Sequence, residues 1–235
     1  SKGFHLTSTW LTGLGATISA WWILVANAWM QHPVGMEFNP DTVRNEMVDF
    51  MAVAFSPVAV NKFCHTVLSS WVLGAVFVIG ISCWFLLKKR DKEFAIASIK
   101  IGAIFGLVAS VLTVWTGDGS GYAVAQTQPM KLAAVEGYYE GQNGAGLVAV
   151  GVLNPDKKTY DDGQNPFLFR IEIPKMLSFL AERKADAFVP GIKNIIEGGY
   201  ELKDGTKALS AAEKIERGKK AITALGTYRA AKKDG

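Results

Sequence analysis

Three long stretches without a charged residue constrain the fold of this chain more than any other feature. Residues 6–36 contain no Asp, Glu, Lys or Arg, and the same holds for residues 63–87 and 101–117. An α-helix rises 1.5 Å per residue, so about 20 apolar residues cross the hydrocarbon core of a bilayer. The sequence therefore predicts an all-α integral membrane part with three transmembrane helices, over residues 6–30, 63–87 and 98–116.

The tryptophans favour membrane helices over the alternative of helices buried in a large soluble core. Several lie near the expected helix ends, where aromatic side chains of membrane proteins concentrate. The tryptophans in question are Trp21, Trp22, Trp29, Trp71, Trp84 and Trp115. A signal peptide is excluded, because the first apolar stretch is too long and two more follow it. The chain starts with Ser1 and ends without a closing element, so we expect a piece of a longer protein.

Charge divides the chain into two parts. Residues 1–117 carry 8 Lys and Arg and 6 Asp and Glu, whereas residues 118–235 carry 17 and 15. We predict a transmembrane helical part over 1–117 and a mixed, loop-rich extracytoplasmic region over 118–235. The net charge of +4, without a basic cluster among exposed aromatics, argues against a nucleic-acid partner.

Local patterns indicate a few elements in the charge-rich part. Residues 147–153 and 167–173 have strand-like patterns, and a short helix is expected over 175–183. Ser210 and Glu213 have the spacing of a capping box, which predicts a helix to about Ala231. The glycine-rich segment 117–122 is interpreted as a flexible exit from the third membrane helix.

Basic residues set the expected orientation. Loop 37–62 has two basic residues against four acidic ones, whereas loop 88–100 has five basic residues. Cytoplasmic loops of membrane proteins carry an excess of Lys and Arg. Loop 88–100 is therefore predicted to be cytoplasmic, and the region from Asp118 onward is predicted to lie outside.

One of the three histidines is a candidate functional residue. His5 and His32 flank the first membrane helix, whereas His65 lies inside the second, about one turn from its outer end. An ionisable residue within a membrane segment is a functional candidate, and imidazole is a common haem ligand. From the residues alone, a hydrogen-bonded packing histidine explains His65 as well as a ligand does.

Small residues in the second and third helices are interpreted as packing residues. Cys64 and Cys83 are about 28 Å apart along a helix, too far for a disulfide. Gly102 and Gly106 have the spacing of a contact face for another helix.

Lys131 and Glu136 follow the third membrane helix. They are five residues apart, about 140° around a helix, so they do not form an i,i+4 pair. Each could point separately at a ligand, although the residues alone favour a solvated amphipathic turn.

Five segments together resemble subunit I of cytochrome bd-type quinol oxidases. They occur in the family's order and at matching separations, and the resemblance is close over about residues 5–140 and loose beyond. The segments are TWLTGLG at 9–15, SAWWILVANAWMQHPVG at 19–35, KFCHT at 62–66, GDGSGY at 117–122 and KLAAVE at 131–136.

The resemblance implies a terminal respiratory oxidase of the bacterial cytoplasmic (inner) membrane. Such an enzyme oxidises quinol near the outer face, passes electrons through haem b558 to haem b595 and haem d, reduces O2 to water and generates a proton motive force. Its partners are subunit II, small accessory subunits and membrane lipid, and its substrate is ubiquinol or menaquinol. The chain alone is expected to be inactive, because the oxygen-site residues lie outside it.

The resemblance also assigns roles to individual residues. It implies that His65 is the axial ligand of haem b558, and that no other haem ligand of the family lies in this chain. It implies that Lys131 and Glu136 bind and oxidise quinol. Beside them, Gln128 and Asp118 are expected as polar residues of the quinol loop, and Ser19 is expected on the cytoplasmic proton path to the oxygen site.

The competing interpretation is a non-enzymatic membrane protein, such as a transporter or sensor fragment with an outer ligand-binding domain. It explains the hydropathy equally well, and it treats Lys131 and Glu136 as a solute site. It explains neither the position of His65 nor the ordered set of motifs.

Overall fold

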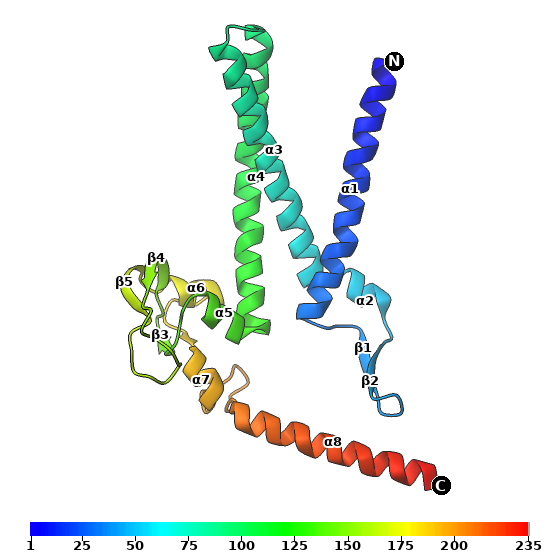
Figure 1. Cartoon of the computed structure of the whole chain (residues 1–235), viewed down its shortest axis with the longest axis vertical. Coiled ribbons are helices and arrows are strands. Elements are labelled where there is room, and N and C mark those ends of the chain that lie inside the picture. Colours follow the sequence, from blue (N-terminus) through cyan, green and yellow to red (C-terminus); the bar gives the residue numbers. More distant parts are fainter. Residues whose placement is uncertain (235) are drawn as a thin grey trace. The chain divides into compact units, whose positions relative to one another are not determined.

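The computed structural model describes residues 1–234, so Gly235, the last residue of the expected outer region, lies outside the described residues (Figure 1). The chain forms two compact units. Unit 1 comprises residues 1–38 and 45–120, and unit 2 comprises residues 39–44 and the chain from Gly121 onward. The division of the chain after Gly117 stays a prediction.

Three long helices dominate unit 1. They are α1 (Lys2–Gln31), α3 (Pro57–Leu87) and α4 (Lys92–Thr127), the last of which continues into unit 2. Within the described residues, each is long and apolar enough to cross a membrane. The three predicted membrane helices are therefore confirmed, and every one extends beyond its predicted bounds. In Figure 1, α3 and α4 run side by side in opposite directions.

Local capping explains why α3 begins before the uncharged stretch. Ser56 is the N-cap, and its hydroxyl accepts a hydrogen bond of 3.2 Å from the amide of Ala59. Pro57 occupies the first helical position, where its missing amide hydrogen costs nothing. Lys62 consequently lies inside the helix, and His65 lies about two turns from the helix start instead of one.

The connection between α3 and α4 is much shorter than the predicted loop 88–100. It spans residues 88–91, and both Lys89 and Asp91 adopt left-handed backbone conformations. Lys92 and Lys100 belong to α4. The prediction was wrong because charged residues at a helix end mark the limit of the apolar stretch, while the backbone helix continues past it.

The glycine-rich segment 117–122 is helical, so the predicted flexible exit is wrong. It forms part of α4, which ends only at Thr127. Two of its glycines face α3 closely: a Cβ atom at Gly117 would lie 3.2 Å from Cε1 of His65, and one at Gly119 would lie 3.2 Å from Oδ1 of Asn61. Close contact with α3 compensates for the helix-weakening tendency of glycine.

The predicted contact face at Gly102 and Gly106 is confirmed. A Cβ atom at Gly106 would lie 2.9 Å from Cβ of Ala75, and one at Gly102 would lie 3.1 Å from Cγ1 of Ile79. Both neighbours belong to α3, and Ala75 is buried. The glycines therefore bring the backbones of α3 and α4 together where larger side chains would hold them apart.

The connection between α1 and α3 has its own structure, which the sequence did not predict. It contains a two-stranded hairpin of β1 (Met36–Asn39) and β2 (Arg44–Met47), followed by α2 (Phe50–Ala54). Asp49 caps α2 by accepting a hydrogen bond of 2.9 Å from the amide of Ala52. A small core of buried residues from α1, α2 and α3 holds this end of unit 1, namely Val25, Ala28, Val53 and Ala59.

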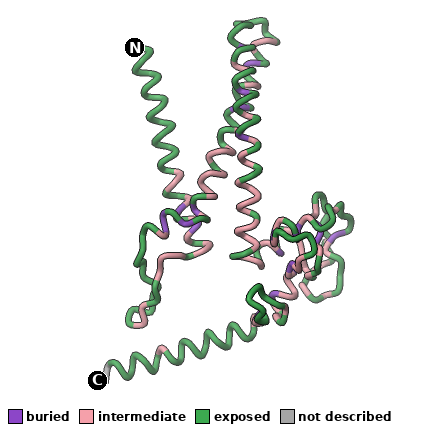
Figure 2. The backbone as a smooth tube through the Cα atoms, turned by 180° about the vertical axis from the view of Figure 1, so that it is seen from behind, coloured by how far each residue is buried: buried purple, intermediate pink, exposed green. Residues whose placement is uncertain are grey.

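Most apolar side chains of the long helices are exposed in this chain. Figure 2 shows most of α1 as exposed, and Leu73 of α3 and Trp115 of α4 are 71% and 73% exposed. Apolar helices that bury so little of their surface within a chain are suited to contact with lipid or with other membrane helices.

Unit 2 contains short helices and strands. Strands β4 (Leu147–Leu153) and β5 (Phe167–Ile173) pair antiparallel, and β3 (Gln142–Asn143) pairs antiparallel with β6 (Phe188–Val189). The helices are α5 (Pro129–Val135), α6 (Met176–Glu182), α7 (Ile192–Glu197) and α8 (Ala211–Asp234). The predicted strands at 147–153 and 167–173 are confirmed, as is the helix within 175–183. The core consists of Ala145, Leu177, Ala181 and Val189.

The predicted capping box of α8 is confirmed. The amide of Glu213 donates a hydrogen bond of 3.1 Å to Oγ of Ser210, and the carboxylate of Glu213 accepts one of 2.8 Å from the amide of Ser210. The last turn of α8 contacts residues 39–44 of the same unit, where Nζ of Lys232 lies 2.5 Å from Oδ2 of Asp41.

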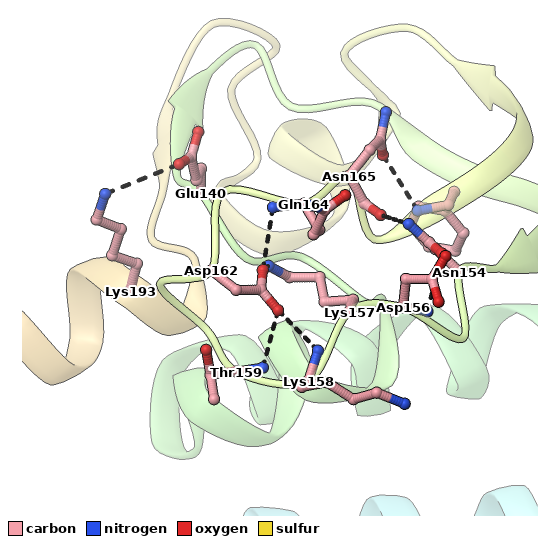
Figure 3. A network of polar contacts seen from close by, with 11 residues as sticks. Glu140, Asn154, Asp156, Lys157, Lys158, Thr159, Asp162, Gln164, Asn165 and Lys193 are labelled. Atoms are coloured by element: carbon pink, nitrogen blue, oxygen red, sulfur yellow. Dashed lines mark hydrogen bonds and ion pairs between the residues drawn. The ribbon is translucent and has the colours of Figure 1, made fainter.

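Loop 154–166 between β4 and β5 is folded around the carboxylate of Asp162 (Figure 3). This carboxylate accepts hydrogen bonds from Nζ of Lys157 and from the amides of Lys158, Thr159 and Gln164, over 2.7 to 3.0 Å. These interactions hold the pKa of Asp162 well below its usual range, and the side chain of Lys157 is the largest cause. A loop that is rich in polar residues is thus locally ordered.

Candidate functional site

His65 lies at the contact between α3 and α4. Its side chain is half-buried, and its Nδ1 lies 3.1 Å from Oγ1 of Thr116 on α4. Gly117, the next residue of α4, leaves room for the imidazole, since a Cβ atom there would lie 3.2 Å from Cε1 of His65. The ring therefore has a polar partner on one edge and a glycine backbone beside it.

Asn61 ties the same parts of α3 and α4 together. Its Nδ2 donates hydrogen bonds to the backbone oxygen of Thr116, at 3.1 Å, and to Oγ of Ser120, at 2.7 Å. Asn61 did not stand out in the sequence because it lies just before the uncharged stretch. The i,i+4 spacing of Asn61 and His65, which puts both on one face of a helix, was the signal that could have found it.

A second polar contact joins α1 to α3 near His65. Nζ of Lys62 donates a hydrogen bond of 2.9 Å to Oδ1 of Asn27, and Nε2 of Gln31 donates one of 3.1 Å to the same oxygen. The ring of Trp21 on α1 meets the ring of Phe63 edge-on, with 4.9 Å between the ring centroids. The segment around His65 is thus fixed by neighbours on both other long helices of unit 1.

His65 is better suited to be an axial ligand of haem iron than to be one of several side chains that bind a metal ion. The described residues contain no group of three or more His, Cys, Asp or Glu side chains that could hold a metal ion. Cys64 and Cys83 are free thiols. Haem iron needs only one or two axial ligands from the protein, and a histidine whose other ring nitrogen is hydrogen-bonded is a common one. Among the described residues, Nε2 of His65 has no hydrogen-bond partner.

Lys131 lies on the short helix α5, and Glu136 is the residue that caps its end. Helix α5 ends at Val135, Glu136 is the C-cap, and the next residue, Gly137, has a left-handed backbone with φ of 60°. The amide of Tyr138 donates a hydrogen bond of 2.7 Å to the oxygen of Ala133, and that of Gly137 donates one of 3.3 Å to the oxygen of Ala134. These bonds form a Schellman motif, which requires a residue that accepts positive φ and so fixes the position of Glu136.

Burial distinguishes the environments of these two residues. Lys131 is exposed, whereas Glu136 is half-buried, and burial raises the pKa of the Glu136 carboxyl above its ordinary value. A carboxyl group with a raised pKa keeps an accepted proton at pH values closer to neutral, and this makes it a better proton acceptor.

The remaining predicted site residues are spread over the two units. Gln128 is the N-cap residue of α5, but its side chain makes no capping hydrogen bond. Asp118 is a half-buried residue of α4 in unit 1, next to Gly117 and its contact with His65. Ser19 is exposed on α1. Within unit 2, the structure keeps Gln128, Lys131 and Glu136 on or beside α5.

Unit 2 also contains a cavity of about 860 Å³ that the sequence did not predict. Its walls include Leu132 of α5 and the aromatic rings of Phe188 and Tyr200. Gln126 and Lys203 lie at its polar side: Gln126 donates a hydrogen bond of 2.7 Å to the oxygen of Ala181 and also bonds to Lys203. Neither Lys131 nor Glu136 is among the residues that line it.

Known proteins resemble this chain in sequence and in fold. The sequence matches the family "Cytochrome bd terminal oxidase subunit I" over residues 1–221. Cytochrome bd-II ubiquinol oxidase subunit 1 of Escherichia coli (strain K12) is 40% identical over 230 residues, which make up 97% of this chain and 44% of that protein. Cytochrome bd ubiquinol oxidase subunit 1 of Bacillus subtilis (strain 168) is 33% identical over 196 residues, 83% of this chain and 40% of that protein.

A solved structure agrees with the sequence comparisons. The structure of bd oxidase from Geobacillus thermodenitrificans matches with a TM-score of 0.68 and 28% identity, covering 83% of this chain and 43% of the matched chain. The chain thus spans less than half the length of the relatives that it matches. With its three membrane-spanning helices and a family match over nearly all of its residues, the chain is a multi-pass membrane protein that belongs to the family of cytochrome bd terminal oxidase subunit I.

Proposed function

We propose that this chain is part of subunit I of a terminal respiratory oxidase that transfers electrons from membrane quinol to O2. The observation that carries the proposal is the setting of His65: a membrane helix presents this imidazole to α4, with Nδ1 bonded to Thr116. The family match and the relatives named as ubiquinol oxidase subunits support it. In the complete enzyme, haem b558 would be the group held by His65.

The chain's own contribution at this site is to bind and orient. A haem b supplies one-electron transfer when it is bound, and haem b595 and haem d, which would reduce O2 to water, are assigned to residues outside this chain. His65 offers one imidazole nitrogen to the iron. Asn61 and Thr116 hold α3 and α4 together beside it, and Gly117 leaves space for the ring.

Quinol oxidation is assigned to Lys131 and Glu136. A quinol that becomes a quinone loses two electrons and two protons. The Glu136 carboxylate accepts one of these protons, since its raised pKa makes the protonated form accessible nearer to neutral pH. The Lys131 ammonium donates a hydrogen bond to a quinol oxygen, and Gln128 and Asp118 are proposed as further polar residues of the quinol loop. Ubiquinol and menaquinol both fit this chemistry.

Orientation would make the reaction electrogenic. The turn between α3 and α4 and the residues that flank it carry Lys88, Lys89, Arg90 and Lys92. This excess of basic residues supports a location of this end of the helices at the cytoplasmic face of the bacterial inner membrane. The other end of α4 and the chain after it then lie on the periplasmic side. Protons leave outside and are consumed from inside, with Ser19 on the inward route. Each charge that crosses is equivalent to about 2.3 kcal/mol per 100 mV.

The complete complex would cover much of the exposed apolar surface of this chain. The proposed partners are subunit II, small accessory subunits and membrane lipid, in contact with the apolar faces of α1, α3 and α4. Because the oxygen-site ligands are assigned elsewhere, the chain by itself would not reduce O2.

The proposal is tested by the reduced-minus-oxidised optical spectrum of the full-length, assembled oxidase. His65→Ala should abolish the signal of the low-spin haem b, because it removes an axial ligand. His32→Ala serves as the matched control, since it removes a histidine at the end of α1 and should leave the spectrum intact. An unchanged low-spin signal in His65→Ala would refute the assignment, and a purified wild-type complex without haem would favour the transporter or sensor interpretation.

A further inference from the structure

Among residues 1–234, the hydroxyl of Thr116 has three hydrogen-bonding neighbours, and it has one proton to share with them. Its Oγ1 lies 3.1 Å from Nδ1 of His65, 3.0 Å from the backbone oxygen of Leu112 and 3.1 Å from the backbone oxygen of Thr113. The two carbonyl oxygens belong to the preceding turn of α4, where threonine hydroxyls commonly bond. Donors and acceptors at this point can therefore be assigned by counting protons.

Carbonyl oxygens only accept hydrogen bonds, whereas a hydroxyl has one proton and two lone pairs. The Thr116 proton is therefore directed at the carbonyl oxygens of Leu112 and Thr113, which share it. Toward His65 the hydroxyl must act as the acceptor, so Nδ1 of His65 must carry a hydrogen. A neutral imidazole has one N–H group, which leaves the lone pair on Nε2.

We infer that Thr116 is a positioning residue that holds His65 in the tautomer with the proton on Nδ1 and thereby makes Nε2 the iron-binding atom. The inference rests on the proposed function of His65 as a haem ligand. It adds a role for a residue of α4 that no sequence motif had singled out. Thr116 acts through His65, without contact to the iron.

Two neighbours keep this hydrogen bond in place. The amide of Asn61, one turn before His65 on α3, bonds to the backbone oxygen of Thr116 itself, so the two helices cannot slide at this point without breaking that bond. Gly117 lets the ring approach α4, since a Cβ atom there would lie 3.2 Å from Cε1 of His65. The geometry of the imidazole is thus set from both helices.

Such a bond has consequences for the bound iron. A hydrogen bond from the outer N–H of a ligating histidine makes the imidazole a stronger donor and fixes its orientation, and the loss of such a partner typically weakens metal binding about 10-fold to 100-fold. When the imidazole becomes a weaker donor, ferric haem loses more stabilisation than ferrous haem does. Without the Thr116 hydroxyl, the midpoint potential of the low-spin haem should therefore become more positive.

The experiment compares variants of the full-length, assembled oxidase. Thr116→Val removes the hydroxyl at nearly constant shape, Thr116→Ser restores it, and Thr113→Val is the matched control, because the Thr113 hydroxyl bonds to Ala109 and does not reach His65. The midpoint potential of the low-spin haem is measured by redox titration, and haem retention is measured by transfer to a haem-scavenging protein. We expect Thr116→Val to have a more positive potential and roughly 10-fold to 100-fold weaker retention. Thr116→Ser and Thr113→Val should match the wild type.

The outcomes separate this inference from the proposed function. If His65→Ala keeps the low-spin haem, the proposed function of His65 fails and the inference fails with it. If His65→Ala loses the haem while Thr116→Val keeps the wild-type potential and retention, only the role of Thr116 is overturned. If Thr113→Val shifts the potential as much as Thr116→Val does, the effect comes from the helix, and the inference is likewise overturned.

Discussion

The side-chain amide of Asn61 donates a hydrogen bond of 2.7 Å to the hydroxyl of Ser120, one full turn beyond the Thr116 oxygen that accepts its second bond. One residue of α3 therefore bridges two successive turns of α4. Because both acceptors must be reached at once, this pair of bonds specifies the register of the two helices as well as their contact. His65 lies one turn further along the same face of α3, so its distance to Thr116 depends on that register.

Removal of the Asn61 amide should loosen the contact between α3 and α4. Interhelical hydrogen bonds in membrane proteins contribute about 0.6 kcal/mol each on average, with a maximum near 1.7. We expect Asn61→Leu to destabilise the assembled oxidase by roughly 1 to 3 kcal/mol, and Ser120→Ala to cost about half as much. Thermal unfolding in detergent measures both. Ser110→Ala is the control, since that hydroxyl bonds to the Gly106 oxygen of its own helix; an equal loss there would show that the interhelical bonds are not the cause.

Lys131 and Glu136 should be required for quinol turnover but not for haem binding. A positioned proton acceptor contributes typically 10²-fold to 10⁴-fold to a rate, so Glu136→Gln should reduce quinol oxidation by about 100-fold or more. Lys131→Ala should mainly raise the KM for quinol, because it removes a hydrogen-bond donor. Lys193→Ala is the matched control, because Nζ of Lys193 lies 3.8 Å from Oε1 of Glu140 and Lys193 is not assigned to the quinol site. Steady-state kinetics with haem content measured in parallel decide the point, and normal turnover in both site variants would refute the assignment.

Burial of Glu136 should be visible in the pH dependence of the reaction. Its pKa in the folded protein lies above the ordinary glutamate value, so the ionised acceptor is lost as the pH falls through that raised value. The acidic limb of kcat/KM for quinol should therefore lie at higher pH than an ordinary glutamate would give, and Glu136→Gln should abolish that limb. A raised carboxyl pKa also means that folding favours the protonated form. Its stabilising effect is present at low pH and is lost as the pH rises through the folded-state pKa, so thermal unfolding at pH 7 should find Glu136→Gln no less stable than the wild type.

Hydropathy predicted the membrane helices well, and it gave the end of α3 at Leu87, but it misplaced the start of α3 and both ends of α4. An uncharged stretch indicates where a bilayer can be crossed. The helix itself begins and ends where its backbone is capped, and Ser56 caps the start of α3. The segment 117–122 also shows that a local pattern can give a wrong helix end. Its glycines have low helix propensity, which favoured a turn, but the contacts of Gly117 and Gly119 with α3 keep the helix intact. Tertiary packing of this kind is invisible to a local pattern.

Site residues were predictable when a motif or a membrane position marked them. His65 stood out as a histidine in an apolar stretch. For Glu136 the residues alone favoured a solvated turn, and the family resemblance made it a site residue. Thr116 and Asn61 had no such mark, because a threonine or asparagine becomes a partner only when another helix presents a suitable atom. The cavity beside Leu132 was likewise not predictable, since its walls come from residues that are up to 79 positions apart in the chain.

The contact of Gly106 with Ala75 can be tested by exchange of the two side chains. A Cβ atom at Gly106 would lie only 2.9 Å from Cβ of Ala75, so Gly106→Ala should force α3 and α4 apart and cost about 1 to 3 kcal/mol of stability. Ala75→Gly in the same chain removes the clashing atom and should recover most of that loss. Thermal unfolding of the two single variants and the double variant gives the coupling energy. Additive losses, with no recovery in the double variant, would mean that this pair does not set the helix separation.

The carboxylate of Asp162 organises much of loop 154–166. Asp162 accepts hydrogen bonds from the Lys157 ammonium and from three backbone amides of the loop (Figure 3). Because these bonds depress its pKa, their stabilising effect is present above the ordinary carboxyl pKa near 4 and is lost only as the pH falls through the lower folded-state value. The loop should therefore keep its structure throughout the neutral and mildly acidic range.

Asp162→Ala should open this loop without unfolding the rest of unit 2. The amides of Lys158, Thr159 and Gln164 lose their acceptor, so their hydrogen exchange at pH 7 should become about tenfold faster or more. Exchange in β4 and β5 should stay the same, because their ladder bonds do not involve the carboxylate. Asp161→Ala removes the neighbouring carboxylate and is the matched control. Mass spectrometry of the assembled oxidase after exchange provides the measurement, and unchanged protection of residues 158–164 in Asp162→Ala would show that the loop is held by other contacts.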